Sequence, residues 1–553
     1  MMQTLYIFSG KHDKSLRKHE GQKVYSYCLG VGKIKGSDVI NVNDNKKLNQ
    51  IAASKARYFS NFVYDQNKLF IEQGLKLDDE LSLYFLTDFS CKRSELFQTY
   101  SDYCNAYLIK QILLERGIGQ VIFDECQPGF IEAASSLLKD IGTSVMNPIP
   151  GKYSIPKVIA KNLYFFFKVM TGNFLTYIFV RNEVKKNGSK KIANLFLTRY
   201  PSHLNAHALD DKYGALVGSD DRYLAHLFTD GFHQNLSVKE YLKSISRLKL
   251  LKNVFVLDHY LRTMDVLENM VLSIRLIPKM SRIAEKKYVL DGIDLSSNIR
   301  DEIYFSMMRL PRLLLWRKSI NRFFGSHVVE NFYFYLHEYS YGRFFTYMLS
   351  KYWSSINLIG FQHGPASLRK MVYMAGDGEL SSKADGLTSF NVPNKVYAED
   401  SFSANIYRSV GYDNVSVMPK IYRLSYLNKI KRHPVKNRIL ITPGLHDGEF
   451  LLRCLLDEMR QNSVILYILK THPRADNRYV SSFCDVKNLV LADKPLLDLL
   501  AEVTKVLATY SSVAIEAKML GIDVELIDIP GKINESPLID DGFLDCVESI
   551  RTY

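Results

Sequence analysis

The sequence predicts an α/β protein with parallel sheets, divided into more than one domain. At 553 residues the chain is too long for one ordinary hydrophobic core, so we expect two or three domains. Short apolar runs that fit buried strands alternate with longer segments that fit helices. Several of these runs end in turns that carry His, Asp, Ser or Gly, and ligands of open α/β sheets bind at the carboxyl ends of the strands.

This alternation divides the chain into four segments. We expect an α/β domain in residues 1–155 and an aromatic, basic connection in residues 156–191. Two Rossmann-like domains are expected to follow, in residues 192–393 and 394–553. Each would be a parallel sheet with its loops gathered at one edge.

Strand-like runs in the first segment lead into acidic residues. Four apolar runs predict strands: residues 5–9, 24–29, 81–86 and 121–123. Asp88 and Asp124 follow two of them closely. An acid at a strand end can bind a sugar, but it is also common turn chemistry, so both interpretations stay open.

Residues 159–180 are rich in aromatic side chains and predict a long helix. Lys161, Lys168 and Asn173 interrupt the apolar run, whereas a bilayer span needs about 20 mostly apolar residues. Further lysines and an arginine follow in residues 181–191. The segment fits either a helix that lies on an anionic lipid surface or a linker helix packed between domains.

The third segment carries two polar clusters behind predicted strands. The strands are expected at residues 194–198, 254–257, 332–336 and 357–361, with helices at residues 244–250 and 303–322. Glu338 follows the third strand, and His363 follows the fourth within Gly-x-Gln-His. Asp377 and Glu379 come a little later. These three acids are candidates for a general base, and otherwise fit helix caps or surface turns.

The fourth segment has polar turns behind three successive strands. The runs at residues 438–442, 464–470, 506–508 and 524–529 predict strands, and residues 513–520 predict a helix that Gly521 ends. The turns hold the residues Gly444, His446, Asp447, His472, Pro473, Ser511 and Ser512. Two serines at a helix start can hold an anion, and Glu516 lies one turn further along the helix. An ordinary capped helix would show the same pattern.

Composition narrows the functional classes. A net charge of +14 favours an acidic partner, but we find no RNA- or DNA-binding motif and expect no nucleic acid. Seven scattered cysteines without CxxC argue against a disulfide framework or a zinc site and favour a reducing compartment. The first 14 residues lack the apolar region of a signal peptide, which predicts a cytoplasmic location. Walker, GxGxxG and DxD motifs are missing, so we predict no cofactor and no metal ligand.

The order of the fourth-segment motifs resembles bacterial GT-B sialyltransferases, which use CMP-activated sugar acids. That family has an acidic pair with glycine, then His-Pro, then a serine pair. His472-Pro473 and Ser511-Ser512 match, whereas His446-Asp447-Gly448 has one acid where the family has two. The resemblance implies a GT-B fold in which the C-terminal domain binds the donor and the N-terminal domain the acceptor.

A looser resemblance covers about residues 330–425. Tyr-Leu-x-Glu before a helix, followed by Gly-x-Gln-His, is similar to bacterial surface-carbohydrate transferases of the Kdo and nonulosonate type. The two resemblances together imply a glycosyltransferase that moves sialic acid, Kdo or another nonulosonate to a surface polysaccharide or lipopolysaccharide. A basic, aromatic helix would let such an enzyme bind the inner face of the membrane peripherally.

The expected chemistry assigns roles to these residues. His472, Ser511 and Ser512 would hold the phosphate of the CMP leaving group without a metal, with Pro473 and Gly444 beside it. Glu516 would reach a ribose hydroxyl. Domain position favours Glu338 as the base and motif order favours Asp447, so the choice stays open, with His363 supporting either. The alternatives are a transferase for CDP-polyols or other nucleotide donors, and a catalytically silent GT-B-like binding protein.

Overall fold

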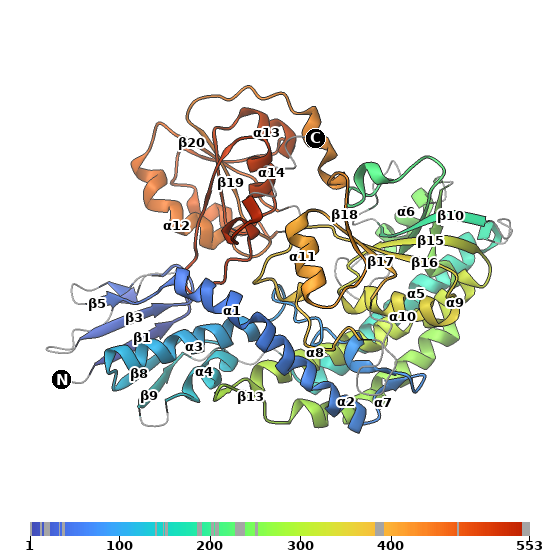
Figure 1. Ribbon diagram of the computed structural model, residues 1–553, viewed down its shortest axis with the longest axis horizontal. Coiled ribbons are helices and arrows are strands. Elements are labelled where there is room, and N and C mark those ends of the chain that lie inside the picture. The colour runs from blue at the N-terminus through green and yellow to red at the C-terminus, as the bar shows by residue number, and fades with distance from the viewer. Residues whose placement is uncertain are drawn as a thin grey trace.

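Three parallel sheets organise the computed structural model (Figure 1). It describes residues 3–10, 14–15, 23–32, 34–35, 39–138, 141–147, 149, 153–184, 191–200, 204, 209–226, 238–248, 251, 253–381, 392–472 and 475–544. We call the parts of the chain that carry the three sheets the first, second and third unit.

The first unit is a 5-stranded sheet with the strand order β5-β3-β1-β8-β9. Its strands are β1 (Thr4–Phe8), β3 (Val24–Cys28), β5 (Val39–Asn41), β8 (Gln120–Asp124) and β9 (Gly142–Met146). The helices are α1 (Asn45–Asp65), α2 (Asn67–Glu72), α3 (Thr99–Arg116) and α4 (Pro128–Ser135). Every strand pair is parallel, and the order reverses at β1, as in Rossmann-like folds.

The second unit is a 7-stranded sheet with the order β12-β11-β10-β15-β16-β17-β18. Its strands are β10 (Lys191–Arg199), β11 (Arg222–His226), β12 (Val254–Val256), β15 (Val328–Tyr335), β16 (Asn357–Phe361), β17 (Lys395–Ala398) and β18 (Val415–Val417). The helices are α5 (Ile155–Val184), α6 (Val238–Leu248), α7 (Thr263–Ala284), α8 (Ser296–Leu314), α9 (Arg317–Phe324), α10 (Ser340–Tyr352) and α11 (Ser401–Ser409). The sheet is again parallel throughout its described pairs.

The third unit is a 5-stranded parallel sheet with the order β21-β20-β19-β22-β23. Its strands are β19 (Arg438–Thr442), β20 (Leu466–Leu469), β21 (Leu489–Leu491), β22 (Lys505–Ala508) and β23 (Asp523–Leu526). The helices are α12 (Gly448–Gln461), α13 (Leu496–Glu502) and α14 (Val513–Met519). The predicted fold class is confirmed, because the chain is α/β and all three units have the Rossmann-like strand order.

The sheet pairing corrects the boundary predicted at residue 394. β17 pairs in parallel with β16, and β18 pairs with β17, so both extend the second sheet. The third sheet starts at β19. The unit boundary therefore lies between β18 and β19, because strand pairing across 34 residues of sequence, from Phe361 to Lys395, leaves no local signal.

Two predicted elements are corrected as well. Residues 81–86 hold a two-residue strand, Leu81–Ser82, and then a 3₁₀ turn, Leu83–Leu86, because the Ser82 hydroxyl accepts a hydrogen bond from the Tyr84 amide. The predicted helix over residues 303–322 is two helices, since α8 ends at Leu314 and α9 starts at Arg317.

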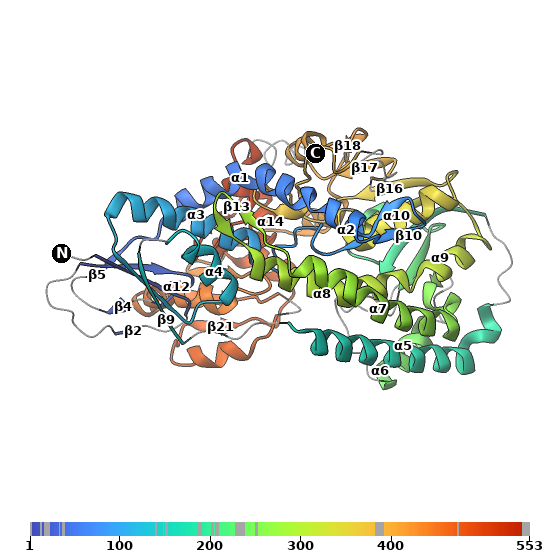
Figure 2. The ribbon, with the colours of Figure 1, turned by 90° about the horizontal axis from the view of Figure 1, so that it is seen from below.

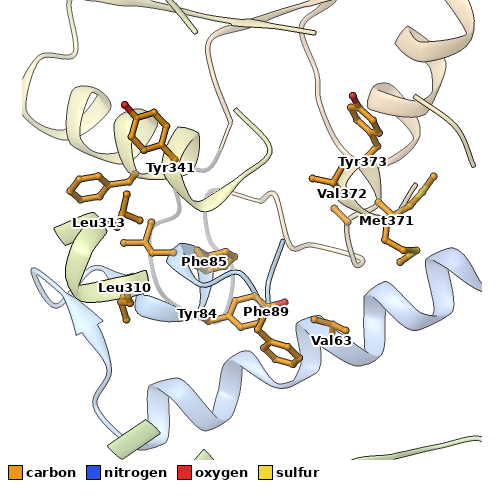
Figure 3. Packing of buried hydrophobic residues seen from close by; sticks show 14 of the residues in the cluster. Val63, Tyr84, Phe85, Phe89, Leu310, Leu313, Tyr341, Met371, Val372 and Tyr373 are labelled. Carbon is orange, nitrogen blue, oxygen red and sulfur yellow. The ribbon is translucent and has the colours of Figure 1, made fainter. Parts of the chain in front are cut away.

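The first and second units share one hydrophobic core. Figure 3 shows Leu310 and Leu313 of α8 beside Phe85 of the first unit, with Tyr341 of α10 nearby. The two larger clusters of the third unit lie one on each side of its sheet, around Leu440 and Ile441. Packing therefore makes the first two units one body.

The segment after β23 returns to the other two units. Asn45 and Asn49 of α1 hydrogen-bond the backbone of residues 529–534, with donor–acceptor distances of 2.7–3.1 Å. Arg369 of the second unit donates to the Asn534 and Ser536 carbonyls and pairs with Asp540 at 2.7 Å. This segment joins all three units near the carboxyl edge of the third sheet.

Candidate functional site

The strand ends with predicted site residues are neighbours in the third sheet. β19 lies between β20 and β22, and all three run in parallel. The loops that follow them hold Asp447, His472 and the pair Ser511 and Ser512. The predicted motif-bearing turns thus lie together at the carboxyl edge of one sheet, at the point where the strand order reverses.

Asp447 is tied to the loop behind β22. The Thr509 hydroxyl donates a hydrogen bond to the Asp447 carboxylate and accepts one from the Gly444 amide at 3.4 Å. Asp447 is 2 % exposed, and this burial raises the pKa of its carboxyl, partly opposed by the hydrogen bond from Thr509. A raised pKa brings the proton affinity of Asp447 closer to that of a general base.

Gly444 provides space in the same loop. A Cβ atom there would lie 2.5 Å from Cζ of Tyr510, so a side chain would displace the tyrosine ring. Burial raises the pKa of the Tyr510 hydroxyl, which therefore stays protonated. Tyr510 and Asp447 both line a cavity of about 130 Å³.

This cavity lies between the third unit and the first unit. The first unit contributes Glu95, Gln98 and Ser101 among others, from the segment that leads into α3 and from the first turn of that helix. Lys532 and Glu535 come from the segment behind β23. Glu95 and Glu535 carry no signal in the sequence, because both lie in loops that come together only when distant units pack.

The two missed carboxylates differ in their electrostatics. Glu95 is partly exposed, and the Arg93 guanidinium, 2.8 Å from its Oε1, holds the pKa of this carboxyl below its usual value. Burial raises the pKa of Glu535, with partial opposition from Lys370. One ionised and one more readily protonated carboxyl in a cavity is an arrangement that suits proton transfer.

The serine turn lies at the start of α14. Ser511 and Ser512 are both half-buried, and the Ser512 carbonyl accepts from the Glu516 amide at 3.2 Å. Ser512 caps the helix without a side-chain hydrogen bond to its amides. Glu516 is buried, its carboxylate accepts from the Tyr426 hydroxyl, and burial raises its pKa.

His472 follows β20 and is half-buried. Its carbonyl accepts a hydrogen bond from the Ala475 amide at 2.9 Å, which turns the chain back at this point. Pro473 and Arg474 lie outside the described residues. Lys470 donates to the Lys494 carbonyl at 2.7 Å and so joins the loop behind β20 to the loop between β21 and α13.

Glu338 lies in a different environment from Asp447. It follows β15 and is 3 % exposed, accepts from the Tyr407 hydroxyl, and lies 3.5 Å from His337 Nε2. Burial lowers the pKa of His337. Glu338 therefore belongs to an aromatic core cluster of the second unit, whereas Asp447 lines a cavity.

The other candidate site residues of the second unit also lie apart from the cavity that Asp447 lines. His363 is half-buried, with its ring centroid 5.3 Å from that of Tyr335. Asp377 is exposed and pairs with Arg57 of α1. Glu379 is fully buried and pairs with Lys92 at 2.9 Å. The last two thus act as contacts between the units.

A second cavity, of about 230 Å³, lies between the second and third units. Asp400, Pro419 and Met519 are among its lining residues. Burial raises the pKa of Asp400 to about 6. Asp400 is also the N-cap of α11 and accepts from the Ser403 amide at 2.6 Å, which gives it a structural role.

In the part of the chain that the structure describes, no group of three or more His, Cys, Asp or Glu side chains is arranged to hold a metal ion. Among the same residues, no helix has the length and hydropathy needed to cross a bilayer.

Comparisons with known proteins give matches of structure alone. No protein-family model and no curated protein matches the sequence. A crystal structure of UDP-GlcNAc 2-epimerase from Neisseria meningitidis bound to UDP-GlcNAc matches with a TM-score of 0.33 and 10 % identity, over 61 % of this chain and 82 % of that one.

Two further solved structures are similar to the same extent. MurG from Acinetobacter baumannii matches with a TM-score of 0.33 and 9 % identity, over 63 % of this chain and 81 % of its own. The wall teichoic acid polymerase TagF matches with a TM-score of 0.29 and 11 % identity, over 72 % and 90 %.

Proposed function

We propose that this protein is a glycosyltransferase of the GT-B type that moves a sugar acid from a CMP donor to a surface polysaccharide or lipopolysaccharide. The observation that carries the proposal is the meeting of three motif-bearing turns at one edge of the third sheet. Asp447, His472 and the Ser511–Ser512 pair follow neighbouring parallel strands. Their order along the chain is that of the family resemblance.

The donor would bind at the serine turn. Ser511 and Ser512 offer hydroxyl groups and His472 an imidazole to the phosphate of CMP, on which negative charge grows as it leaves. Gly444 leaves room for the Tyr510 ring in the neighbouring turn. Glu516 would bind a ribose hydroxyl after exchanging its hydrogen bond with Tyr426.

Asp447 is the better supported base of the two that the sequence left open. An acceptor hydroxyl attacks the anomeric carbon, the bond from that carbon to the CMP phosphate breaks, and the base takes the hydroxyl proton. Asp447 lines a cavity, whereas the carboxylate of Glu338 is buried against Tyr407. Glu95 and Glu535 would hydrogen-bond the acceptor sugar in the same cavity.

The decisive experiment is a donor screen on the whole protein. Thermal shift with CMP-sialate, CMP-Kdo, CMP-legionaminate and CMP-pseudaminate identifies the donor, and release of CMP in the presence of glycan acceptors then measures turnover. Stabilisation by one of these donors, with turnover, supports the proposal. Response to CDP-glycerol instead would identify a polyol phosphotransferase, which also releases CMP. A failure of every nucleotide to stabilise the protein would favour a silent binding protein.

We propose that the protein acts in the cytoplasm, where CMP-sugars are the donor substrates, with glycan or glycolipid acceptors at the inner membrane face.

Serine and histidine controls are available in the third unit. Ser481 and His433 are both exposed and lie away from the strand ends, so Ser481→Ala and His433→Ala are expected to leave donor binding unchanged.

A further inference from the structure

Helix α5 exposes a continuous apolar stripe. Ile159, Leu163, Phe167, Phe174 and Ile178 are spaced by 4, 4, 7 and 4 residues, so they lie on one face of the helix. Phe167 is 68 % exposed and Phe174 is 61 % exposed. Tyr164 beside them is 62 % exposed. Burying large aromatic side chains is favourable, so such a stripe indicates a contact surface.

The opposite face of α5 is anchored in the protein. Val158, Phe166 and Val169 are fully buried in the core that the first two units share. Asn162 donates to the Met307 carbonyl of α8 at 3.1 Å, and Asn173 donates to the Leu261 carbonyl at 2.7 Å. These contacts hold the helix in one orientation, so the apolar stripe faces away from the core.

Figure 2 shows α5 along one outer edge of the molecule, with α6 next to it. On α6, the exposed residues Lys239, Lys243 and Arg247 are spaced by four and share a face. On α5, Lys157 and Lys161 are exposed on one side of the stripe. Apolar residues bordered by basic ones are the pattern of a helix that lies on anionic lipid.

We propose that α5 and α6 form a docking surface for an anionic bilayer. The stripe from Ile159 to Ile178 is about 29 Å long at 1.5 Å per residue and would lie in the plane of the headgroups. The bordering lysines and arginine would contact lipid phosphates. A second copy of this chain fits the surface less well, because its own α5 and α6 would bring the same positive charges.

Flotation of the whole protein with vesicles tests this surface. The probes are vesicles of phosphatidylcholine alone and vesicles with about 30 % phosphatidylglycerol, at low and high salt. The protein is expected to float with the anionic vesicles at low salt, and to float less at high salt. The Phe167→Ser/Phe174→Ser variant is expected to bind at least about tenfold more weakly, because it removes two exposed rings. Lys239→Glu/Lys243→Glu/Arg247→Glu should bind weakly as well.

A matched control removes exposed apolar residues elsewhere. Leu114 and Val464 are 79 % and 77 % exposed, on α3 and before β20, and Leu114→Ser/Val464→Ser should float like the parent protein. Circular dichroism and melting temperature confirm that each variant is folded. Equal flotation of the Phe167→Ser/Phe174→Ser variant and the parent, or equal binding to neutral vesicles, overturns the proposal. So does a dimer in sedimentation that Phe167→Ser/Phe174→Ser dissolves. Release of CMP with a soluble acceptor does not depend on this surface, so the two proposals fail separately.

Discussion

The Thr509 hydroxyl donates a hydrogen bond to the Asp447 carboxylate, which joins the loops behind β19 and β22. The two residues lie 62 positions apart in the sequence. This bond fixes the carboxylate at the wall of the cavity that the first and third units share. Asp447 is therefore held in place as a base would need to be.

Replacing Asp447 with asparagine tests its role as the base. Asp447→Asn keeps the hydrogen bond from Thr509 but removes the proton acceptor, so turnover should fall by about 10²–10⁴-fold. Affinity for CMP, measured by calorimetry, should stay close to that of the parent, because the base contacts the acceptor. Asp476→Asn, at a surface aspartate, is the control. Unchanged turnover in Asp447→Asn would exclude Asp447 as the base. Glu338 would then be the candidate base, and Glu338→Gln would test it.

The pH dependence of turnover gives a second measure of the same group. Burial raises the pKa of Asp447, and a base acts in its ionised form. Turnover should therefore fall as the pH drops through this raised pKa, at a higher pH than for an ordinary aspartate. Thr509→Val removes a hydrogen bond that lowers the pKa, so the acid limb should move to still higher pH. If the acid limb of Thr509→Val lies at the same pH as that of the parent protein, Asp447 is not the group that titrates.

His472→Ala is expected to slow transfer more than either serine variant. Losing one preorganised group that stabilises a developing charge costs about 2–4 kcal/mol of barrier. Ser511→Ala and Ser512→Ala should each cost less, because the backbone amides at the turn remain. Initial rates with saturating donor measure this, with His433→Ala as control. EDTA should leave the rates unchanged. Complete loss of activity with EDTA, restored by a divalent metal, would mean that the transfer depends on a metal ion.

Stability should change with pH through Glu302. Burial raises the pKa of this glutamate from its usual value to about 8. Between about pH 4.5 and pH 8 the folded protein holds a proton that the unfolded chain releases, so the free energy of unfolding falls as pH rises across this window. Glu302→Gln should lose less stability between pH 5 and pH 8, as measured by urea denaturation. An identical slope in both proteins would show that Glu302 titrates normally.

The buried pair of Lys92 and Glu379 should be sensitive to single substitution. Both side chains are at most 1 % exposed, and the pair joins the first unit to the second at 2.9 Å. Lys92→Met leaves the Glu379 carboxylate with Arg343 as its remaining charged partner. The loss of Lys92 should therefore lower the free energy of unfolding by about 3–5 kcal/mol. Lys92→Met/Glu379→Gln should recover part of this. A surface pair, Arg460 and Asp485, is the control, since Arg460→Met should cost less than about 1 kcal/mol.

Local sequence predicted individual strands better than the contacts between units. β19 and β16 have the predicted bounds, because each is a continuous apolar run between polar turns. The motif-bearing turns lie on neighbouring strands as that pattern implies. The role of β17 could not be predicted, because strand pairing is decided by residues far away in the sequence.

The cavity between the first and third units could not be predicted from the sequence either. Glu95 and Glu535 both line it although they are 440 positions apart, and neither lies directly at the end of a strand. Glu338 looked equivalent to Asp447 in sequence, since both follow apolar strands. Tyr407, 69 residues further on, covers Glu338 and decides the difference. A sequence pattern gives the end of a strand, but the packing of other elements determines whether that end is open.

The division of the core has a consequence for how the molecule melts. The first two units are packed around one continuous cluster, while the third has its own clusters on both sides of its sheet. Heat should then unfold the protein in two calorimetric transitions rather than one. A nucleotide that binds the third unit should raise the midpoint of one transition and leave the other in place. Which of the two midpoints shifts would thus report directly which part of the chain holds the nucleotide.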